Sequence, residues 1–146
     1  ESDNIAVKEI AFSNREKAKV AYVVDGDTIE LTDKRRVRYI GINTPEINFG
    51  KGNPQCFATD AARINKELVA GQDIEMEKDV SQTDKYGRLL RFVYADDVLI
   101  NDFLLRQGYA RLEQVPPDTR LSQQFKEAVS EAKENKRGLW KTCEKL

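Results

Sequence analysis

The first third of the chain alternates short β-forming segments with tight turns, and this pattern restricts the possible folds more than any other feature. Residues 17–24 and 29–31 carry valine, tyrosine, isoleucine and leucine, and Asp-Gly-Asp-Thr at 25–28 separates them as a hairpin turn. A second turn at 32–34 leads into a third strand, residues 36–42. Because both connections are short, neighbouring strands must run antiparallel. The sequence therefore predicts a three-stranded meander at the start of the fold.

The remainder of the chain adds two strands and three helices. Further strands are expected at 73–78 and 89–94, where β-forming residues cluster. The expected helices have apolar residues on one face and capping residues near their ends: 58–70, 100–107 with Asn101 near its start, and 121–132 capped by Asp118 or Thr119. Because helices do not alternate with strands, the expected fold class is α+β. A closed five-stranded β-barrel of the OB type with three α-helices fits this order and leaves few strand edges exposed.

Length and composition indicate one folded domain. The chain has 146 residues, 40% of them hydrophobic and 34% charged, which fits a globular protein rather than a disordered one. No repeat or linker divides it, so residues 1–16 are expected to form an arm and residues 17–146 a single domain. No apolar run approaches the roughly 20 residues that span a bilayer, so no membrane partner is expected. The first residues lack a signal-peptide pattern, but a trimmed mature form would look the same, so export is not excluded.

Histidine is absent, and its absence excludes several kinds of chemistry. Catalysis by Ser-His-Asp or Cys-His, a histidine general base and histidine metal ligands are all ruled out. Two cysteines, Cys56 and Cys143, are too few for a structural zinc site. An enzyme of this composition would work with carboxylates, guanidinium groups, hydroxyls and a hard cation such as calcium or magnesium.

The net charge of −1 provides no general attraction for polyanions, so nucleic-acid binding would have to depend on local clusters of cations. Two such clusters occur, at residues 34–38 and 85–91. Clusters of this kind are often only solvated faces, and the sequence leaves that alternative open.

The end of the predicted third strand collects polar groups of several kinds. A cation, an amide, a hydroxyl and a carboxylate lie close together in the chain: Arg38, Asn43, Thr44 and Glu46. Asp27, in the first turn, would lie beside Asn43 and Thr44 in a meander, and oxygen ligands from two loops are what a calcium site requires. The alternative is a solvated edge strand in which Asp27 only stabilises the turn at 25–28, which is the role expected of Asp25.

Three segments, taken together and in this order, resemble the staphylococcal nuclease (thermonuclease) family: Asp-Gly-Asp-Thr at 25–28, residues 38–46, and Thr-Asp-Lys-Tyr-Gly-Arg at 83–88. The resemblance extends to Leu-Arg-Gln-Gly at 105–108 and Gly-Leu-Trp at 138–140, so it covers most of the chain. It implies an OB-fold barrel with three helices and a calcium-dependent phosphodiesterase that acts on DNA and RNA. Such an enzyme breaks the bond to the 5′ oxygen and leaves 3′-phosphate ends.

By motif position, the resemblance assigns a role to each of these polar residues. Arg38 and Arg88 match the catalytic arginines, Glu46 the general base, Asp27 and the carbonyl of Thr44 the calcium ligands, and Lys85 and Tyr86 the residues that hold a terminal phosphate. Two guanidinium forks suit a transition state that gathers negative charge on phosphate oxygens. A free carboxylate is a weak base at neutral pH, so Glu46 either needs the metal or acts by positioning the attacking water.

The chain departs from the family pattern at two places. Asn43 stands where a second calcium-binding aspartate is expected; its amide can still ligate the ion but carries no charge, so weak calcium binding is expected. The segment 113–117 lacks the tyrosines that line the base pocket in the best-known member of the family. Base stacking is then either weaker or supplied by Tyr109 or Phe49.

The leading hypothesis is a secreted or periplasmic, monomeric nuclease that cuts DNA and RNA. A non-catalytic OB-fold module that binds nucleic acid is the alternative, and a protein-interaction domain on the same barrel is a third. Because the whole reactive set is present, the enzyme is favoured. In an exported protein an even cysteine count favours a disulfide between Cys56 and Cys143, with two buried thiols as the alternative.

Overall fold

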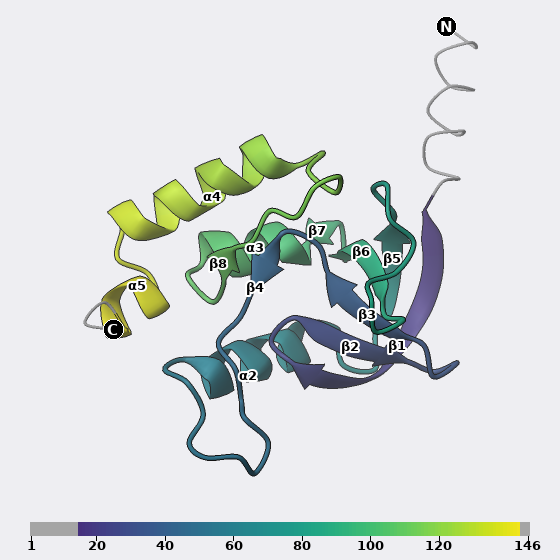
Figure 1. The fold of residues 1–146 in the computed structure, drawn as a ribbon, viewed down its shortest axis with the longest axis horizontal. Helices are drawn as coiled ribbons and strands as arrows, with labels where there is room; N and C mark the ends of the chain where they lie inside the picture. The colour runs from purple at the N-terminus through teal and green to yellow at the C-terminus, as the bar shows by residue number, and fades with distance from the viewer. Residues whose placement is uncertain (1–14, 144–146) are drawn as a thin grey trace, which may run out of the picture.

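The first three strands form the predicted meander (Figure 1). The structure, a computed structural model, describes residues 15–143, so most of the predicted arm at 1–16 lies outside the described residues. The strands β1 (Glu16–Asp25), β2 (Thr28–Leu31) and β3 (Arg36–Tyr39) pair in antiparallel order. Asp25 pairs with Thr28 across the turn, so Asp27 lies at the end of the first hairpin.

Two further strands close the sheet into a barrel. The ten-residue β1 pairs with β2 at one end and with β5 (Asp73–Glu77) at the other, and register shifts along its pairing with β2 bend it. β6 (Leu89–Ala95) pairs with β5 and also runs parallel to β3, which joins the two edges of the sheet. The strand order β3-β2-β1-β5-β6 is therefore closed, and the predicted α+β fold with a five-stranded OB-type barrel is confirmed.

Within the described residues, three helices of seven residues or more pack around the barrel, as predicted: α2 (Ala58–Val69), α3 (Ile100–Arg106) and α4 (Ser122–Glu134). The remaining elements are short: α5 (Leu139–Thr142), β4 (Ile42–Asn43), β7 (Val98–Leu99) and β8 (Arg111–Leu112). β7 extends the barrel sheet beside β6, whereas β4 and β8 pair as a separate ribbon. Figure 1 shows α3 between α4 and the barrel strands. No helix in residues 15–143 is long and apolar enough to span a membrane.

The core fills the barrel and continues between the barrel and the helices. Phe92 of β6 and Phe125 of α4 are fully buried and meet edge to face, with ring centroids 6.0 Å apart. The buried hydroxyl of Tyr39 donates to Asn65 Oδ1 on α2 at 2.7 Å, and Asn65 Nδ2 donates to the carbonyl of Asp25 at 2.9 Å. These bonds tie α2 to the hairpin that carries Asp27.

The predicted third strand, residues 36–42, is wrong in one respect, because a turn at Gly41 divides it into β3 and β4. Gly41 has a φ of +83°, and a Cβ atom there would lie 2.7 Å from the ring of Phe125. Glycine therefore permits both the turn and the close approach of α4. The break lets Ile42 and Asn43 leave the barrel and pair with β8.

The helix caps predicted from the sequence are also wrong. Asn101 lies inside α3, is fully buried, and accepts the backbone N–H of Val93 at 2.9 Å. α4 begins after Leu121, so neither Asp118 nor Thr119 caps it. Asn101 and Asp118 instead accept backbone N–H groups of other elements, which are buried for Asn101 and partly buried for Asp118.

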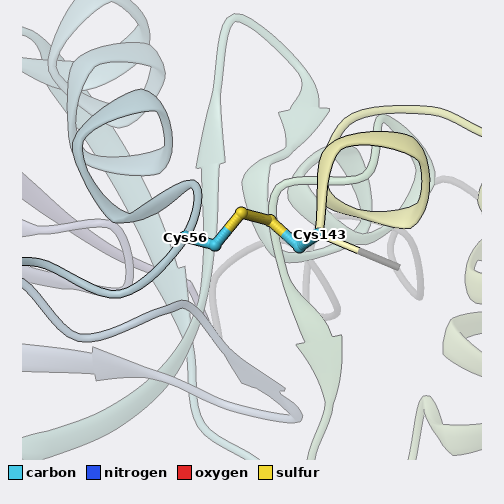
Figure 2. The surroundings of a disulfide bond; sticks show 2 residues. All are labelled: Cys56 and Cys143. Carbon is cyan, nitrogen blue, oxygen red and sulfur yellow. A yellow bond between two sulfur atoms is a disulfide. The ribbon is translucent and has the colours of Figure 1, made fainter. Parts of the chain in front are cut away.

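The predicted disulfide between Cys56 and Cys143 is confirmed (Figure 2). Cys56 lies just before α2 and Cys143 directly follows α5, and their Cα atoms are 5.9 Å apart. The bond links positions that are 87 residues apart in the chain, so it fixes the C-terminal helix against the start of α2.

Removing this bond should destabilise the protein. For a loop of this length the loop-entropy model gives about 4–5 kcal/mol. Replacing both cysteines with serine should lower the free energy of unfolding by roughly that amount in urea denaturation. Thiol titration of the denatured, unreduced protein should detect no free thiol, and the appearance of reactive thiols would contradict the bond.

Candidate active site

A cavity of about 500 Å³ opens at the end of β3, between the hairpin at residues 82–88 and the segment at residues 113–118. Four of the predicted site residues line this cavity, which we call the arginine pocket: Arg38, Lys85, Tyr86 and Arg88. Three carboxylates line it as well: Asp84, Glu113 and Asp118. The pocket therefore combines cations from two distant segments with carboxylates, of which Glu113 pairs with Arg38 and Asp84 with Arg88.

Arg38 is held by the backbone around the Gly41 turn. Its Nη1 donates to the carbonyl of Tyr39 at 2.8 Å and to the carbonyl of Ile42 at 2.7 Å. These two carbonyls lie on either side of Gly41, so the guanidinium spans the turn that ends β3. Only 13% of the Arg38 side chain is exposed. Its position is therefore set by the fold before any ligand binds.

The outer nitrogen of Arg38 is shared among three side chains. Nη2 lies 3.4 Å from Asn43 Oδ1, 3.4 Å from Asp27 Oδ2 and 3.3 Å from Glu113 Oε2. All three distances are long for a charge-assisted hydrogen bond. Arg38 Nη2 therefore forms no strong hydrogen bond with any one of the three side chains. An incoming anion can displace the side chain of Glu113, which is 49% exposed.

Arg88 is oriented by Asp84, four residues earlier in the same hairpin. Arg88 Nε donates to Asp84 Oδ2 at 2.7 Å, and Asp84 Oδ1 accepts the backbone N–H groups of Tyr86 and Arg88 at 2.9 and 3.0 Å. Although partial burial favours the neutral acid, these donors hold the pKa of Asp84 below its ordinary value. The ionised carboxylate therefore fixes both the hairpin and the guanidinium that it presents.

Asp27 forms a second, oxygen-rich cluster beside Arg38. Its Oδ1 accepts the hydroxyl of Thr28 at 3.2 Å and its Oδ2 accepts the N–H of Thr44 at 2.9 Å, and the residue is only 5% exposed. Asp25 is bonded directly to this residue, because its Oδ1 accepts the backbone N–H of Asp27 at 3.0 Å. Burial, aided by the neighbouring Asp27 carboxylate, raises the pKa of Asp25 to about 7. The predicted approach of Asp27 to Thr44 is therefore present.

The oxygen cluster fits a hard divalent cation. Carboxylate and amide oxygens, as in Asp25, Asp27 and Asn43, are the donors that calcium prefers. Burial, and after it the charge of Asp27, raises the pKa of Asp25, and a cation placed here would favour the ionised form of both carboxylates. No group of three or more acidic, histidine or cysteine side chains suited to a metal gathers within residues 15–143. Water and substrate oxygens would therefore have to complete the coordination.

Glu46 lies outside the arginine pocket, although its backbone is well held. Its N–H donates to Gln55 Oε1 at 2.7 Å, and its carbonyl accepts the N–H of Gln55 at 2.8 Å. These bonds close the loop between β4 and α2. The exposed carboxylate of Glu46 makes no hydrogen bond or ion pair with any residue that the structure describes. It is therefore free to interact with water.

Known proteins share much of this sequence. The family model described as staphylococcal nuclease homologue matches residues 36–142, which include both arginines and Glu46. The chain belongs to the staphylococcal nuclease family. The SPbeta prophage-derived endonuclease YokF of Bacillus subtilis (strain 168) is 41% identical to it over 122 residues, which are 80% of this chain and 41% of YokF.

Two further relatives support membership of the staphylococcal nuclease family. Endonuclease YncB of Bacillus subtilis (strain 168) is 38% identical over 122 residues, 80% of this chain and 58% of YncB. The thermonuclease of Staphylococcus hyicus is 30% identical over 135 residues, 90% of this chain and 79% of the thermonuclease. The chain thus spans about half the length of the two Bacillus endonucleases but most of the thermonuclease.

In this staphylococcal nuclease family member, Asp118 connects the two sides of the arginine pocket, the segment at residues 113–118 and the chain that leads into the hairpin at residues 82–88. Its Oδ1 accepts the backbone N–H groups of Val80 and Ser81 at 2.9 and 2.7 Å. Burial alone would raise the pKa of Asp118, but these donors hold it below its ordinary value. The next residue, Gln82, is bound from the barrel side, where buried Arg91 donates to its carbonyl and to its side chain.

Sequence reasoning missed the carboxylates that shape the site. Asp84 carried a usable signal, because it precedes Arg88 by four residues in a turn. Glu113 carried none, because its partner Arg38 is 75 residues away in the chain. Asp118 was assigned to a helix cap and Asp25 only to its turn. The burial and the distant partners that decide their roles exist only in the folded protein.

Asp118 should stabilise the protein in a pH-dependent way. Replacing Asp118 with alanine leaves two backbone N–H groups without their acceptor, which should cost about 1–3 kcal/mol of unfolding free energy. Because folding lowers the pKa of Asp118, its stabilisation is fully present above the unfolded carboxyl pKa of about 4. It is lost as the pH falls through the lower pKa of the folded state. Urea unfolding of wild type and variant should therefore differ most near neutral pH and converge in acid.

Asp118→Asn and Asp73→Ala serve as controls for this experiment. The asparagine keeps an acceptor oxygen without the charge, so it should recover part of the lost stability and show less pH dependence. Asp73 is exposed and is not bonded to the pocket hairpin in the described structure, so its replacement should change little. A difference between wild type and Asp118→Ala that stays constant with pH would show that the charge of Asp118 contributes nothing.

Proposed function

We propose that this protein is a nuclease that hydrolyses phosphodiester bonds of DNA and RNA, leaves 3′-phosphate ends and requires calcium. The observation that carries the proposal is the convergence of two guanidinium groups, from Arg38 and Arg88, on one pocket beside the buried carboxylate of Asp27. Membership of the staphylococcal nuclease family supports it, as do the names of the relatives, two endonucleases and a thermonuclease.

The two arginines bind the reacting phosphate and stabilise its charge. Arg88 uses Nε to bind Asp84, which leaves its terminal N–H groups for an anion. Arg38 turns Nη2 toward the exposed Glu113, whose place a phosphate oxygen takes. A guanidinium stays charged at any working pH, and its parallel N–H groups match two phosphate oxygens. The forks therefore stabilise the negative charge that builds up as water attacks phosphorus.

Lys85 and Tyr86 hold a terminal phosphate at the rim of the arginine pocket. The Nζ of Lys85 lies 5.2 Å from the centroid of the Tyr86 ring, and the Cζ of Arg88 lies 5.4 Å from it. The ring therefore attracts both cations of this hairpin. Tyr86 is 72% exposed, so its hydroxyl is accessible to a ligand.

Glu46 takes the proton of the attacking water or orients that water. Its carboxylate is exposed and follows Thr44 and Pro45, so it lies close in the chain to the oxygen cluster. Asp27, Asn43 and the carbonyl of Thr44 would hold the calcium ion, with Asp25 nearby. When bound, the ion would neutralise part of the phosphate charge and make the attacking water more acidic. A more acidic water compensates for the weakness of a free carboxylate as a base.

The disulfide supports a secreted or periplasmic location, because such bonds persist in oxidising compartments. A monomer suffices for this function, because the described residues of one chain line the arginine pocket. The alternative function is a non-catalytic OB-fold module that binds nucleic acid. The presence of both arginines together with Glu46 and Asp27 favours the enzyme, because binding alone does not need a carboxylate that can act as a base.

Degradation of single-stranded DNA and of RNA should require calcium. Because Asn43 adds no charge to the site, full activity should need calcium in roughly the 10⁻⁴–10⁻³ M range. Excess chelator should abolish the activity, and the products should carry 3′-phosphate ends. Full activity in chelator would overturn the metal-dependent mechanism. Binding of both polymers without cleavage in calcium would favour the non-catalytic module.

The same calcium titration defines the role of Asn43. Asn43→Asp adds a charged ligand and should lower the calcium concentration for half-maximal activity several-fold. It should also destabilise the metal-free protein, because the new carboxylate lies in the cluster with Asp27. Asn135→Asp adds the same charge at the exposed end of α4 and should leave the calcium concentration for half-maximal activity unchanged. If Asn43→Asp binds calcium no tighter in calorimetry, residue 43 is not a ligand.

Replacing either arginine of the pocket with lysine should slow the reaction strongly. Lysine keeps the charge but cannot present two parallel donors, so kcat should fall by roughly 10²-fold in Arg38→Lys and in Arg88→Lys. Arg36→Lys, on the exposed side of β3, is the matched control and should retain the wild-type rate. Near wild-type rates in both pocket variants would show that bidentate binding is not the source of the rate.

A further inference from the structure

Two arginines in residues 15–143 lack a carboxylate within ion-pair distance, and their surroundings differ. All the other described arginines form an ion pair. Arg91 is buried and bound to Gln82, which accounts for it. Arg111 is exposed on β8. An exposed arginine without a counter-ion marks a surface that can receive an anion.

The guanidinium of Arg111 is placed by an aromatic ring rather than by hydrogen bonds. Its Cζ lies 5.5 Å from the centroid of the Trp140 ring on α5, and the Nζ of Lys133 on α4 lies 4.7 Å from the same centroid. A guanidinium over an aromatic ring keeps its N–H donors directed outward. Arg111 donates none of them to a residue that the structure describes. Both cations lie near the same ring, and neither forms an ion pair with a residue that the structure describes.

The β4–β8 ribbon places this pair of cations next to the oxygen cluster. Arg111 lies directly opposite Asn43 in the antiparallel pairing of β8 with β4. Directly opposed residues project their side chains from the same face of a ribbon. Asn43 Oδ1 in turn lies 3.4 Å from Arg38 Nη2. Asn43 therefore stands between Arg38, which lines the arginine pocket, and Arg111, which lies over Trp140.

We propose that Arg111, Lys133 and Trp140 form a second subsite that binds a backbone phosphate of single-stranded DNA or RNA outside the arginine pocket. The proposal rests on the proposed function, because it extends the path of the same substrate. A strand whose phosphate is held at Arg38 and which continues over the β4–β8 ribbon meets Arg111 next. Arg111 donates to this phosphate, and the charge of Lys133 near the same ring adds to the attraction.

The chemistry of the subsite selects the backbone and not the bases. Lysine and arginine donors bind phosphate oxygens, which carry no sequence information. Trp140 holds the two cations close to its ring, so its role is to position them. A short substrate that ends within the arginine pocket does not reach the subsite. The subsite should therefore matter only for longer strands, whatever their sequence.

Salt dependence of binding tests the subsite without any cleavage. A labelled oligothymidylate of about 12 nucleotides is bound in excess chelator over a series of salt concentrations, and fluorescence anisotropy gives the association constant. Each phosphate contact on a single strand contributes about 0.7 to the slope of log K against log salt, so Arg111→Gln should reduce that slope by about 0.7. Lys126→Gln removes the same charge from an exposed position on α4 and should leave the slope nearly unchanged.

Substrate length provides the second measurement. In calcium, Arg111→Gln should lower kcat/KM for the oligonucleotide by about threefold to tenfold and leave kcat/KM for the short ester thymidine 5′-(4-nitrophenyl phosphate) unchanged. Lys133→Gln should behave in the same way, and it carries the test if Arg111→Gln fails to fold. Equal slopes for Arg111→Gln and Lys126→Gln would overturn the subsite. An equal loss on both substrates would also overturn it, because Arg111 would then act within the arginine pocket.

These measurements distinguish failure of the subsite from failure of the proposed nuclease function. If neither substrate is cleaved in calcium but the Arg111→Gln slope still falls, the nuclease proposal fails and the phosphate subsite is supported. If both substrates are cleaved by wild type and the slope does not fall, the nuclease proposal stands and the subsite is wrong.

Discussion

The site depends on one guanidinium group. Arg38 donates to the carbonyls of Tyr39 and Ile42 on either side of the Gly41 turn, and its other nitrogen lies between Asp27 and Glu113. One side chain thus stabilises the turn that ends β3, balances the buried carboxylate of the first hairpin and lines the cavity. The group proposed to bind phosphate is therefore also a structural element. Its substitution will affect stability and catalysis together, whereas Arg88 sits on a surface hairpin and reports on catalysis more directly.

The hairpin at residues 82–88, which forms one side of the arginine pocket, is held in place by charged side chains that bind the backbone. Asp118 accepts two N–H groups from the neighbouring loop, and Arg91 donates to the next residue from inside the barrel. Loops rarely have enough apolar surface to fix themselves, so ionic hydrogen bonds serve that purpose here. Within the hairpin, Asp84 likewise forms an ionic hydrogen bond, which orients Arg88. Pre-positioned cations need little reorganisation when charge develops on a substrate.

Local sequence determined much of this protein. Alternating β-forming segments and the Asp-Gly turn dictated the meander, and apolar periodicity located the three main helices within a few residues. These features follow from interactions between near neighbours, which a linear pattern records. The order of short motifs placed Arg38, Lys85, Tyr86 and Arg88 in one site, and they do line one pocket. The absence of histidine by itself limits the chemistry that the protein can carry out.

Tertiary structure alone decided the rest. The break at Gly41 depends on the approach of Phe125 from α4, and the roles of Glu113 and Asp118 depend on partners far away in the chain. Likewise, only the folded structure shows that Arg111 has no carboxylate within ion-pair distance, whereas every other described arginine except the buried Arg91 has one. Burial, pairing and the balance of charges are properties of groups brought together from distant segments. A linear sequence therefore shows which groups are available, and only the folded chain determines which of them meet.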